Sequence, residues 1–350
     1  STRSIVIHSI MIKLLVNGFG TIGKRVAEAI QKQEDMKLYG ISDVSKGPEM
    51  ETLLSPKGEL HKVDVYASNK EGAEKLRKDN VDIEGTLEEH SDEIDIVVDS
   101  TPSGVDKSNK ENIYKPNNLK AVFQGGAPDD IADVKFNADA NYQEANGENY
   151  VKVVSCNTTS LSRTMNTLEE NFGVDEVVAN LVRRGGDIPQ DGRGPINSII
   201  PVTDVPSHHG PDVKAVMPEL DIKTLAVKVP VTYGHVHMVN AELEQDVNEE
   251  EIIEAFEKNP RINLLEAEKG FDSTSKVHEM MRDLGRKRSD MQETGVWKET
   301  ITVEDGTCYW IHMVHQESIV TPDTIDAIRS MLGLEGKQRS MEKTNKSLQI

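Results

Sequence analysis

The first 150 residues alternate short apolar runs with segments of helical spacing. Residues 11–16 form an apolar, β-prone run that stops at Asn17-Gly18, after which apolar residues recur at the spacing of a helix. Three later apolar runs end in polar or glycine-rich residues, and they cover residues 37–41, 94–98 and 121–123. Strands that alternate with helices form a parallel sheet, whose ligands bind at the carboxyl ends of the strands. We therefore expect these endings to line one binding site.

From residue 151 onward, long β-prone stretches replace the alternating pattern. They cover residues 174–182, 224–231, 235–243 and 307–314. With few helices between them, these stretches predict a mainly antiparallel sheet. The intervening residues 183–210 are rich in Gly, Pro, Asp and His, and they are too many for a plain connector, so we predict a functional loop.

The two patterns predict an α/β fold in which a Rossmann domain with a parallel sheet precedes an α+β catalytic domain with a mainly antiparallel sheet. A helix over residues 321–333, with Thr321 as its N-cap, is expected to complete the first domain. The remaining boundaries are a leader outside the fold at 1–10, a dinucleotide-binding domain at 11–154, a catalytic domain at 155–320 and a charged, frayed tail at 334–350.

Composition narrows the classes of partner. The 350 residues include 60 acidic and 40 basic side chains, a formal net charge of −20 spread along the chain, which argues against a nucleic-acid partner. Two distant cysteines give neither a disulfide framework nor a zinc site. No apolar run approaches the ~20 residues that span a bilayer, so we expect a cytoplasmic protein without a membrane partner.

A glycine-rich turn indicates a dinucleotide cofactor. The hexapeptide Gly18-Phe19-Gly20-Thr21-Ile22-Gly23 fits GxGxxG, and it lies between a predicted strand and a predicted helix, as that motif requires. Such glycines allow a tight turn and the close approach of a pyrophosphate to the helix N-terminus. Asp43 follows about 20 residues later, at the end of the second strand, where a carboxylate accepts ribose hydroxyls. A turn or helix cap is the alternative role for Asp43.

Cys156 is the candidate nucleophile. It follows the apolar run 151–154 and precedes a predicted helix over residues 161–168, so its thiol lies at a helix N-terminus. The partial positive charge there favours the reactive thiolate. Cys308 lies inside an apolar strand and is expected to be a small core residue.

Histidines and arginines supply the other candidate site residues. His235 and His237 lie two residues apart, so in a strand both face the same side, and either can serve as the general base. A metal site is not expected, because no carboxylate or cysteine lies nearby at ligand spacing. A further group of cationic residues can donate to a phosphorylated substrate, or else it belongs to a solvated charged loop. These residues are Arg183, Arg184, His208, His209 and Lys214.

Two of these motifs resemble the paired signatures of archaeal glyceraldehyde-3-phosphate dehydrogenases, namely residues 17–25 and 155–159. Residues 194–197, 206–214 and 315–320 are similar to that family in the same order. The resemblance implies that Cys156 attacks the aldehyde of D-glyceraldehyde 3-phosphate and that a hydride passes to a nicotinamide. Inorganic phosphate then cleaves the thioester, giving 1,3-bisphosphoglycerate. It further implies a homotetramer.

The same resemblance implies roles for individual residues. The substrate or its phosphates would contact Ser155, Asn157, His208 and His209, to which we add Arg183. The cofactor would be lined by Thr21, Ile22, Gly126, Arg184 and Gln316. These add to the residues that the glycine-rich motif and the second strand already indicate, which are Gly18, Gly20, Gly23 and Asp43. The archaeal branch draws its catalytic base from the later strand, which favours His235, with His237 as the fallback.

The choice of cofactor depends on the end of the second strand. Archaeal relatives often carry a lysine there and accept NADP, whereas here Asp43 comes first and Lys46 three residues later. A carboxylate repels a 2′-phosphate, so NAD is the favoured cofactor and NADP the second one. Alternatives within the same fold are aspartate-semialdehyde and N-acetylglutamyl-phosphate reductases, and from another class a non-catalytic dinucleotide-binding protein.

Overall fold

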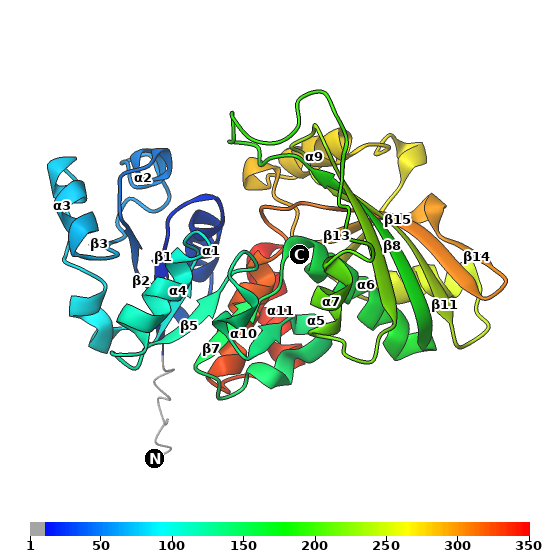
Figure 1. The fold of residues 1–350 in the computed structure, drawn as a ribbon, viewed down its shortest axis with the longest axis horizontal. Helices are drawn as coiled ribbons and strands as arrows, with labels where there is room; N and C mark the ends of the chain where they lie inside the picture. The colour runs from blue at the N-terminus through cyan, green and yellow to red at the C-terminus, as the bar shows by residue number, and fades with distance from the viewer. Residues whose placement is uncertain (1–10) are drawn as a thin grey trace, which may run out of the picture.

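The computed structural model describes residues 11–350, so the leader predicted for residues 1–10 lies outside the described residues. Within the described range the strands form two sheets in separate domains (Figure 1). The first is seven-stranded with the order β3-β2-β1-β4-β5-β7-β6, and the second is eight-stranded with the order β12-β13-β15-β11-β8-β10-β9, where β14 pairs with β15. The predicted α/β fold class is confirmed.

Every strand pair of the first sheet is parallel. Its strands are β1 (Ile12–Asn17), β2 (Met36–Asp43), β3 (Val65–Ala67), β4 (Ile96–Asp99), β5 (Lys120–Phe123), β6 (Val134–Phe136) and β7 (Tyr150–Val153). The helices between them are α1 (Thr21–Gln31), α2 (Pro48–Leu53), α3 (Lys70–Lys78), α4 (Val105–Asn109) and α5 (Ala138–Asn141). Leu14 and Leu15 of β1 are buried in different hydrophobic clusters, because both faces of the sheet are covered.

The second sheet is mainly antiparallel, as predicted, with parallel pairs only at β8–β10 and β12–β13 among the described strands. Its strands are β8 (Val174–Arg184), β9 (Ile200–Pro201), β10 (Ile222–Val229), β11 (His235–Leu243), β12 (Ile262–Leu265), β13 (Thr294–Trp297), β14 (Thr302–Glu304) and β15 (Thr307–Val314). The accompanying helices are α6 (Cys156–Phe172), α7 (His209–Lys214), α8 (Glu249–Glu257) and α9 (Thr274–Asp283).

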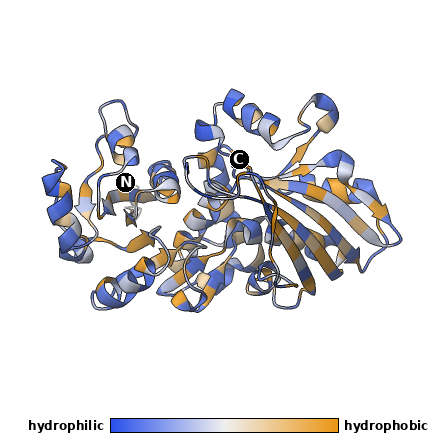
Figure 2. Cartoon of the chain, turned by 45° about the horizontal axis from the view of Figure 1, so that its top comes forward, coloured by the Kyte–Doolittle hydropathy of each residue, from blue (hydrophilic) through white to orange (hydrophobic). Residues whose placement is uncertain are grey.

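One face of this second sheet packs on helices, and the strands alternate accordingly. Apolar and polar residues follow each other along its strands (Figure 2). Leu161 and Leu168 of α6 share a core with Ala179 of β8 and Val239 of β11. Short helical turns connect the elements, at η1 (Glu88–Glu93), η2 (Lys110–Tyr114), η3 (Asp129–Ile131), η4 (Tyr142–Ala145), η5 (Ala267–Lys269), η6 (Lys287–Ser289) and η7 (Lys298–Thr300). No helix among residues 11–350 has the length and apolar character needed to cross a membrane.

The helix α10 (Thr321–Met331) returns from the second domain to the first, where Ile325 and Ile328 join the core of the parallel sheet. The predicted N-cap is wrong, because Thr321 already belongs to the helix and the capping position falls on the residue before it. Its N-cap is Val320, whose carbonyl accepts from Thr324 N–H, and Thr321 is the first helical residue. Within the described chain, Thr321 Oγ1 makes no hydrogen bond.

The frayed tail expected at residues 334–350 is also wrong, since α11 (Lys337–Leu348) packs against α10. Ser340 Oγ and Thr344 Oγ1 each donate to Asp326 Oδ1 at 2.7 Å and are fully buried. The last leucine of the helix joins the core of the first domain. The sequence alone suggests that these hydroxyls face solvent, because their acceptor, Asp326, lies on another helix.

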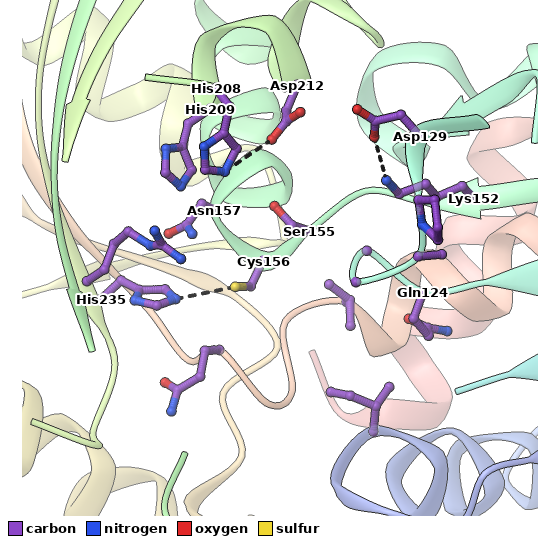
Figure 3. A pocket seen from close by; sticks show the side chains of 18 of the residues that line it. Gln124, Asp129, Lys152, Ser155, Cys156, Asn157, His208, His209, Asp212 and His235 are labelled. Carbon is purple, nitrogen blue, oxygen red and sulfur yellow. Dashed lines mark hydrogen bonds and ion pairs between the residues drawn. The ribbon is translucent and has the colours of Figure 1, made fainter. Parts of the chain in front are cut away.

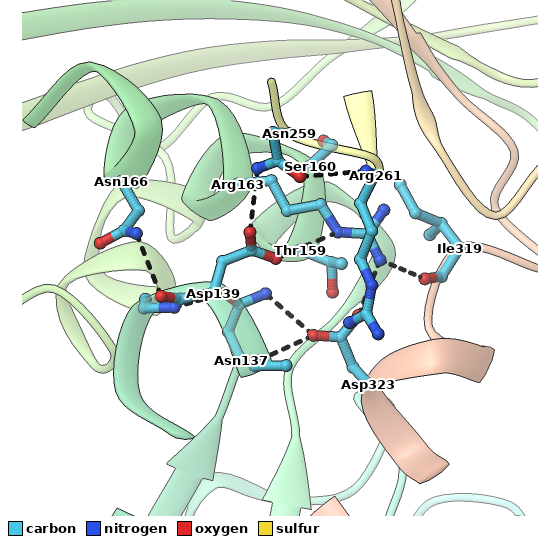
Figure 4. A network of polar contacts seen from close by, with 12 residues as sticks. Asn137, Asp139, Thr159, Ser160, Arg163, Asn166, Asn259, Arg261, Ile319 and Asp323 are labelled. Atoms are coloured by element: carbon cyan, nitrogen blue, oxygen red, sulfur yellow. Dashed lines mark hydrogen bonds and ion pairs between the residues drawn. The ribbon is translucent and has the colours of Figure 1, made fainter. Parts of the chain in front are cut away.

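A buried polar network joins α10 to both domains (Figure 4). Asp323 of α10 accepts from Arg163 Nη2 of α6 at 2.7 Å, and from the backbone N–H of Ala138 at 2.9 Å. Arg163 also donates to the carbonyl of Ile319 at 3.0 Å. Both charged side chains are completely buried, so each depends on the other for compensation.

Replacement of the arginine tests this dependence. Arg163→Met should lower the free energy of unfolding by about 3–5 kcal/mol, because Asp323 would remain buried without its cation. Lys223→Met, which breaks the exposed pair of Lys223 with Glu176, should cost less than about 1 kcal/mol. Urea unfolding followed by circular dichroism measures both values, and equal losses would contradict the role assigned to the buried pair.

Candidate active site

A cavity of about 590 Å³ lies between the two domains at the N-terminus of α6 (Figure 3). It brings together most of the predicted site residues, although they come from distant parts of the chain. Those that line it are Ile22, Gly126, Ser155, Cys156, Asn157, Arg183, Arg184, His208, His209, His235 and Gln316. The predicted glycines Gly18, Gly20 and Gly23, with Thr21 and Asp43, lie outside its lining, and the exposed Lys214 also does not line it.

Cys156 is the first residue of α6, and Ser155 is the N-cap, whose side chain accepts from Thr158 N–H. The Cys156 Sγ lies 3.3 Å from His235 Nε2. Burial raises the pKa of the Cys156 thiol, while Arg184, the backbone N–H of Asn157 and Arg183 act in the opposite direction. The positive surroundings expected for the thiol are therefore present, but the effect of burial is larger. The pKa of the thiol is raised, whereas the sequence predicted that it would be lowered.

His235 is held by backbone and by burial. Its Nδ1 lies 3.1 Å from the backbone N–H of Arg184, which can only donate, so Nδ1 accepts. Burial, followed by the charges of Arg184 and Arg183, lowers the pKa of His235 well below its ordinary value, which keeps the ring neutral. A neutral imidazole with an accepting Nδ1 carries its proton on Nε2, the atom that faces the sulfur of Cys156.

His237 faces the same side of β11 as His235, as the two-residue spacing predicts, and the ring centroids are 6.4 Å apart. Its own contacts lie elsewhere, however. The Nε2 atom lies 2.9 Å from Asn157 Oδ1, and the Nδ1 atom lies 2.9 Å from His312 Nε2. His237 thus contacts Asn157 and His312 and not the thiol of Cys156.

The cationic residues differ in how free they are. Arg184 Nε donates to Asp187 at 3.0 Å, whereas the Nε of Arg183 has no hydrogen-bond partner within residues 11–350. His209 is buried against Ser207 Oγ, and burial lowers the pKa of His209 to about 3, so this ring is neutral. The side chain of His208 is exposed and lies 4.0 Å from Asp212. Arg183 and His208 are therefore the donors of this group that an anion can reach.

The glycine-rich turn has the backbone that its motif requires. Gly18 has a φ of +91°, and a Cβ on Gly23 would overlap the carbonyl oxygen of Gly18. Gly20 is the N-cap of α1, and a Cβ there would meet no atom of the described chain within 4 Å. Asp43 Oδ2 accepts from the backbone N–H of Phe19 at 2.8 Å, which is the turn-capping contact left open by the sequence.

Comparisons with known proteins agree with this arrangement. The sequence model of the glyceraldehyde 3-phosphate dehydrogenase C-terminal domain matches residues 155–298. The glyceraldehyde-3-phosphate dehydrogenase of Pyrococcus abyssi is 47% identical over 97% of this chain and 99% of its own length. This chain belongs to the glyceraldehyde-3-phosphate dehydrogenase family.

Further family members from archaea support the predicted archaeal resemblance, which is confirmed. Those of Thermococcus kodakarensis and Archaeoglobus fulgidus are each 44% identical over 97% of this chain, and the matches cover 99% and 98% of the relatives. The two reductases and the non-catalytic protein considered from the sequence therefore lose their support. A nicotinamide dinucleotide is the cofactor class that the family implies.

Lys152 and Asp129 are among the residues of the cavity lining that the sequence analysis did not predict. Lys152 lies in β7 and is buried, with its Nζ 2.8 Å from Asp129 Oδ1. A lysine between two valines of a predicted buried strand, Val151 and Val153, is the signal that could have identified it. Together with Arg183 and Arg184, Lys152 is a third basic side chain in the cavity lining, and it is paired with Asp129.

Alkylation separates the two cysteines experimentally. Iodoacetamide should label Cys156 and spare Cys308, whose thiol is fully buried with a pKa raised by burial to about 12. From about pH 6 to about pH 9 the rate at Cys156 should rise, because the thiolate is the reactive form.

Arg183→Met should slow this labelling at each pH, because loss of a positive neighbour raises the pKa of the Cys156 thiol. Arg282→Met, on the exposed face of α9, is the control that should leave the rate unchanged. Peptide mapping by mass spectrometry reads out both sites. Equal rates for the Arg183 variant and the parent would contradict the electrostatic role.

Proposed function

We propose that this chain catalyses the phosphorylating oxidation of D-glyceraldehyde 3-phosphate to 1,3-bisphosphoglycerate, with a nicotinamide dinucleotide as the hydride acceptor. The observation that carries the proposal is the 3.3 Å contact between Cys156 Sγ and His235 Nε2 at a helix N-terminus. It lies in a cavity whose lining reaches Ile22 of α1 on the dinucleotide side and Arg183 on the catalytic side. The names of the archaeal relatives support the same reaction.

The residues around the glycine-rich turn suit the cofactor that the family implies. The open space at Gly20 and the N-terminus of α1 give a pyrophosphate room and unpaired backbone donors. A bound nicotinamide dinucleotide would accept a hydride from carbon. Gly126, Arg184 and Gln316 line the cavity on the way from the turn to Cys156 and are proposed to contact it.

In this proposal Cys156 reacts as the thiolate, having lost its proton to solvent, and its sulfur bonds to the aldehyde carbon. The carbonyl oxygen becomes an alkoxide, and His235 Nε2–H donates to it. Loss of the hydride from carbon turns this hemithioacetal into a thioester, and an oxygen of inorganic phosphate then displaces the Cys156 thiolate. The ring atoms favour hydrogen-bond donation as the first task of His235, which refines the general-base role expected from the sequence.

The phosphorylated substrate and inorganic phosphate are proposed to bind to the cations that surround the thiol. Arg183 lines the cavity, the His208 side chain is exposed, and Lys152 adds charge from β7. Ser155 and Asn157 flank Cys156 and are proposed to contact the substrate. The homotetramer implied by the resemblance stays a prediction.

NAD is proposed as the favoured cofactor. The carboxylate of Asp43 is held at the glycine-rich turn by Phe19 N–H, at the end of β2. In dinucleotide-binding folds a carboxylate in this place accepts the ribose hydroxyls. Lys46, the nearby lysine considered for a 2′-phosphate, has its Nζ 2.5 Å from Glu51 Oε1. A paired lysine is a weaker attraction for NADP than a free one, and the Asp43 charge repels the additional phosphate.

The central experiment is a spectrophotometric assay with glyceraldehyde 3-phosphate, phosphate and each dinucleotide in turn. Cys156→Ser should abolish turnover and leave dinucleotide binding intact, because a hydroxyl lacks the acidity and nucleophilicity of the thiol. Retention of more than about a tenth of the parent activity would exclude Cys156 as the nucleophile, since covalent catalysis predicts a much larger loss.

His235→Asn should lower turnover by about 10²- to 10⁴-fold and slow thiol alkylation, because the Nε2–H donor next to the sulfur is lost. His278→Asn, at a buried histidine outside the cavity lining, is the matched control and should retain near-parent kinetics. A turnover of the His235 variant close to that of the parent would remove His235 from the catalytic site.

Cofactor choice is tested at Asp43 with two variants. Asp43→Ala should raise the relative use of NADP and weaken the binding of NAD, because both the repelling charge and the ribose acceptor are removed. Asp43→Asn keeps an acceptor for Phe19 N–H and removes only the charge, so it should shift the ratio with less loss of affinity. If both variants keep the parent ratio of NAD to NADP efficiency, Asp43 does not face the ribose.

A further inference from the structure

Four buried side chains form a chain of hydrogen bonds behind the cysteine. The indole Nε1 of Trp310 lies 3.0 Å from His312 Nδ1, and His312 Nε2 lies 2.9 Å from His237 Nδ1. His237 Nε2 in turn lies 2.9 Å from Asn157 Oδ1. His237 and His312 are directly paired across β11 and β15, and none of the four residues is more than 4% exposed.

The direction of each hydrogen bond follows from the indole. An indole N–H can only donate, so His312 Nδ1 accepts, and the ring proton of the neutral His312 lies on Nε2. This proton is donated to His237 Nδ1, which leaves the proton of His237 on Nε2, where it is donated to Asn157 Oδ1. Burial lowers the pKa of His312 to about 3 and that of His237 well below its ordinary value, so both rings are neutral.

The chain of hydrogen bonds determines which way the Asn157 amide points. Its oxygen is engaged by His237, while its Nδ2 makes no hydrogen bond to any residue in the range 11–350, and Asn157 lines the cavity beside Cys156. Figure 3 shows the amide between Cys156 and the two histidines His208 and His209. Both N–H groups of Nδ2 are therefore left for a ligand.

A flipped amide would break the chain. If Asn157 donated to His237, His237 Nε2 would have to accept and its proton would move to Nδ1. His312 Nε2 would then accept as well, and its own proton would lie on Nδ1, facing the N–H of Trp310. The N–H of Trp310 and the Nδ1–H of His312 would then face each other in a buried site, which is unfavourable. The indole therefore excludes the flipped orientation of the Asn157 amide, although it does not contact Asn157.

We propose that Trp310, His312 and His237 are positioning residues that hold the Asn157 amide with Nδ2 toward the cavity, where it donates to an oxygen of the substrate bound at Cys156. This inference rests on the proposed function for the identity of the substrate. His237, the fallback base of the sequence analysis, thereby receives a different role. It acts through Asn157 and does not exchange a proton with the thiol.

The ring protons can be observed directly. In the parent enzyme labelled with ¹⁵N-histidine, long-range ¹H–¹⁵N spectra should show His237 and His312 protonated on Nε2, without titration from about pH 5 to about pH 8. A proton on Nδ1 of either ring would overturn the proposal. This measurement needs no substrate, so it separates the inference from the proposed function, which fails instead if the parent does not oxidise glyceraldehyde 3-phosphate.

A double-mutant cycle tests the consequence for catalysis. Trp310→Phe keeps an aromatic ring against Phe256 but removes the N–H. It should convert His312 to a mixture of ring forms and lower kcat/KM about 3- to 10-fold, as expected for the loss of one orienting hydrogen bond. In the Asn157→Ala background the same substitution should have no further effect.

The other tryptophan of the chain is the matched control. Trp297 Nε1 donates to the carbonyl of Phe271, away from the histidines, so Trp297→Phe should leave the ring forms unchanged and its effect on kcat/KM, if any, should be equal in both backgrounds. If Trp310→Phe lowers kcat/KM equally in the parent and in Asn157→Ala, Trp310 is only a packing residue and the proposal is overturned.

Discussion

The ion pairs between buried carboxylates of α10 and arginines of the second domain are the interaction on which the active site depends. Asp323 pairs with Arg163 at 2.7 Å, and Asp326 pairs with Arg261 at 2.6 Å, with all four side chains fully buried. Because an unpaired buried charge is very costly, these pairs allow little freedom between α10 and α6. Since α10 belongs to the core of the parallel sheet, they also fix Cys156 relative to the glycine-rich turn.

Much of the fold can be predicted from the sequence because it depends on local periodicity. Runs of apolar residues identify β1, β2, β4, β5 and β7 of the first sheet, and long β-prone stretches identify β8, β10, β11 and β15 of the second. The strands β1 and β11 agree with their predicted ranges to within a residue. The helix in the predicted tail could not be found in this way. The helix α11 is recognisable only once Asp326 is known to accept from its hydroxyls, and that acceptor comes from a different helix.

The candidate site shows the same division. The positions of Cys156 at a helix start and of His235 on a strand follow from spacing along the chain. The proton on His235 Nε2 does not, because it depends on a backbone N–H that the neighbouring β8 supplies at Arg184. The sign of the pKa shift at Cys156 likewise depends on burial, which no local pattern reveals. The sequence thus indicates which side chains come together in the site. Their protonation depends on contacts with residues far away in the chain.

The return of α10 and α11 to the first domain has a consequence for the order in which the chain is made. During synthesis the strands of the parallel sheet are made before the second domain, but their core includes Ile325 and Ile328, which are made after it. Residues 155–320, in contrast, follow one another without interruption. The second domain can therefore fold on the growing chain, whereas the first domain completes its core only after α10 and α11 have been made. Until then, an apolar face of the sheet stays exposed, and in this interval the chain has the greatest need of chaperones.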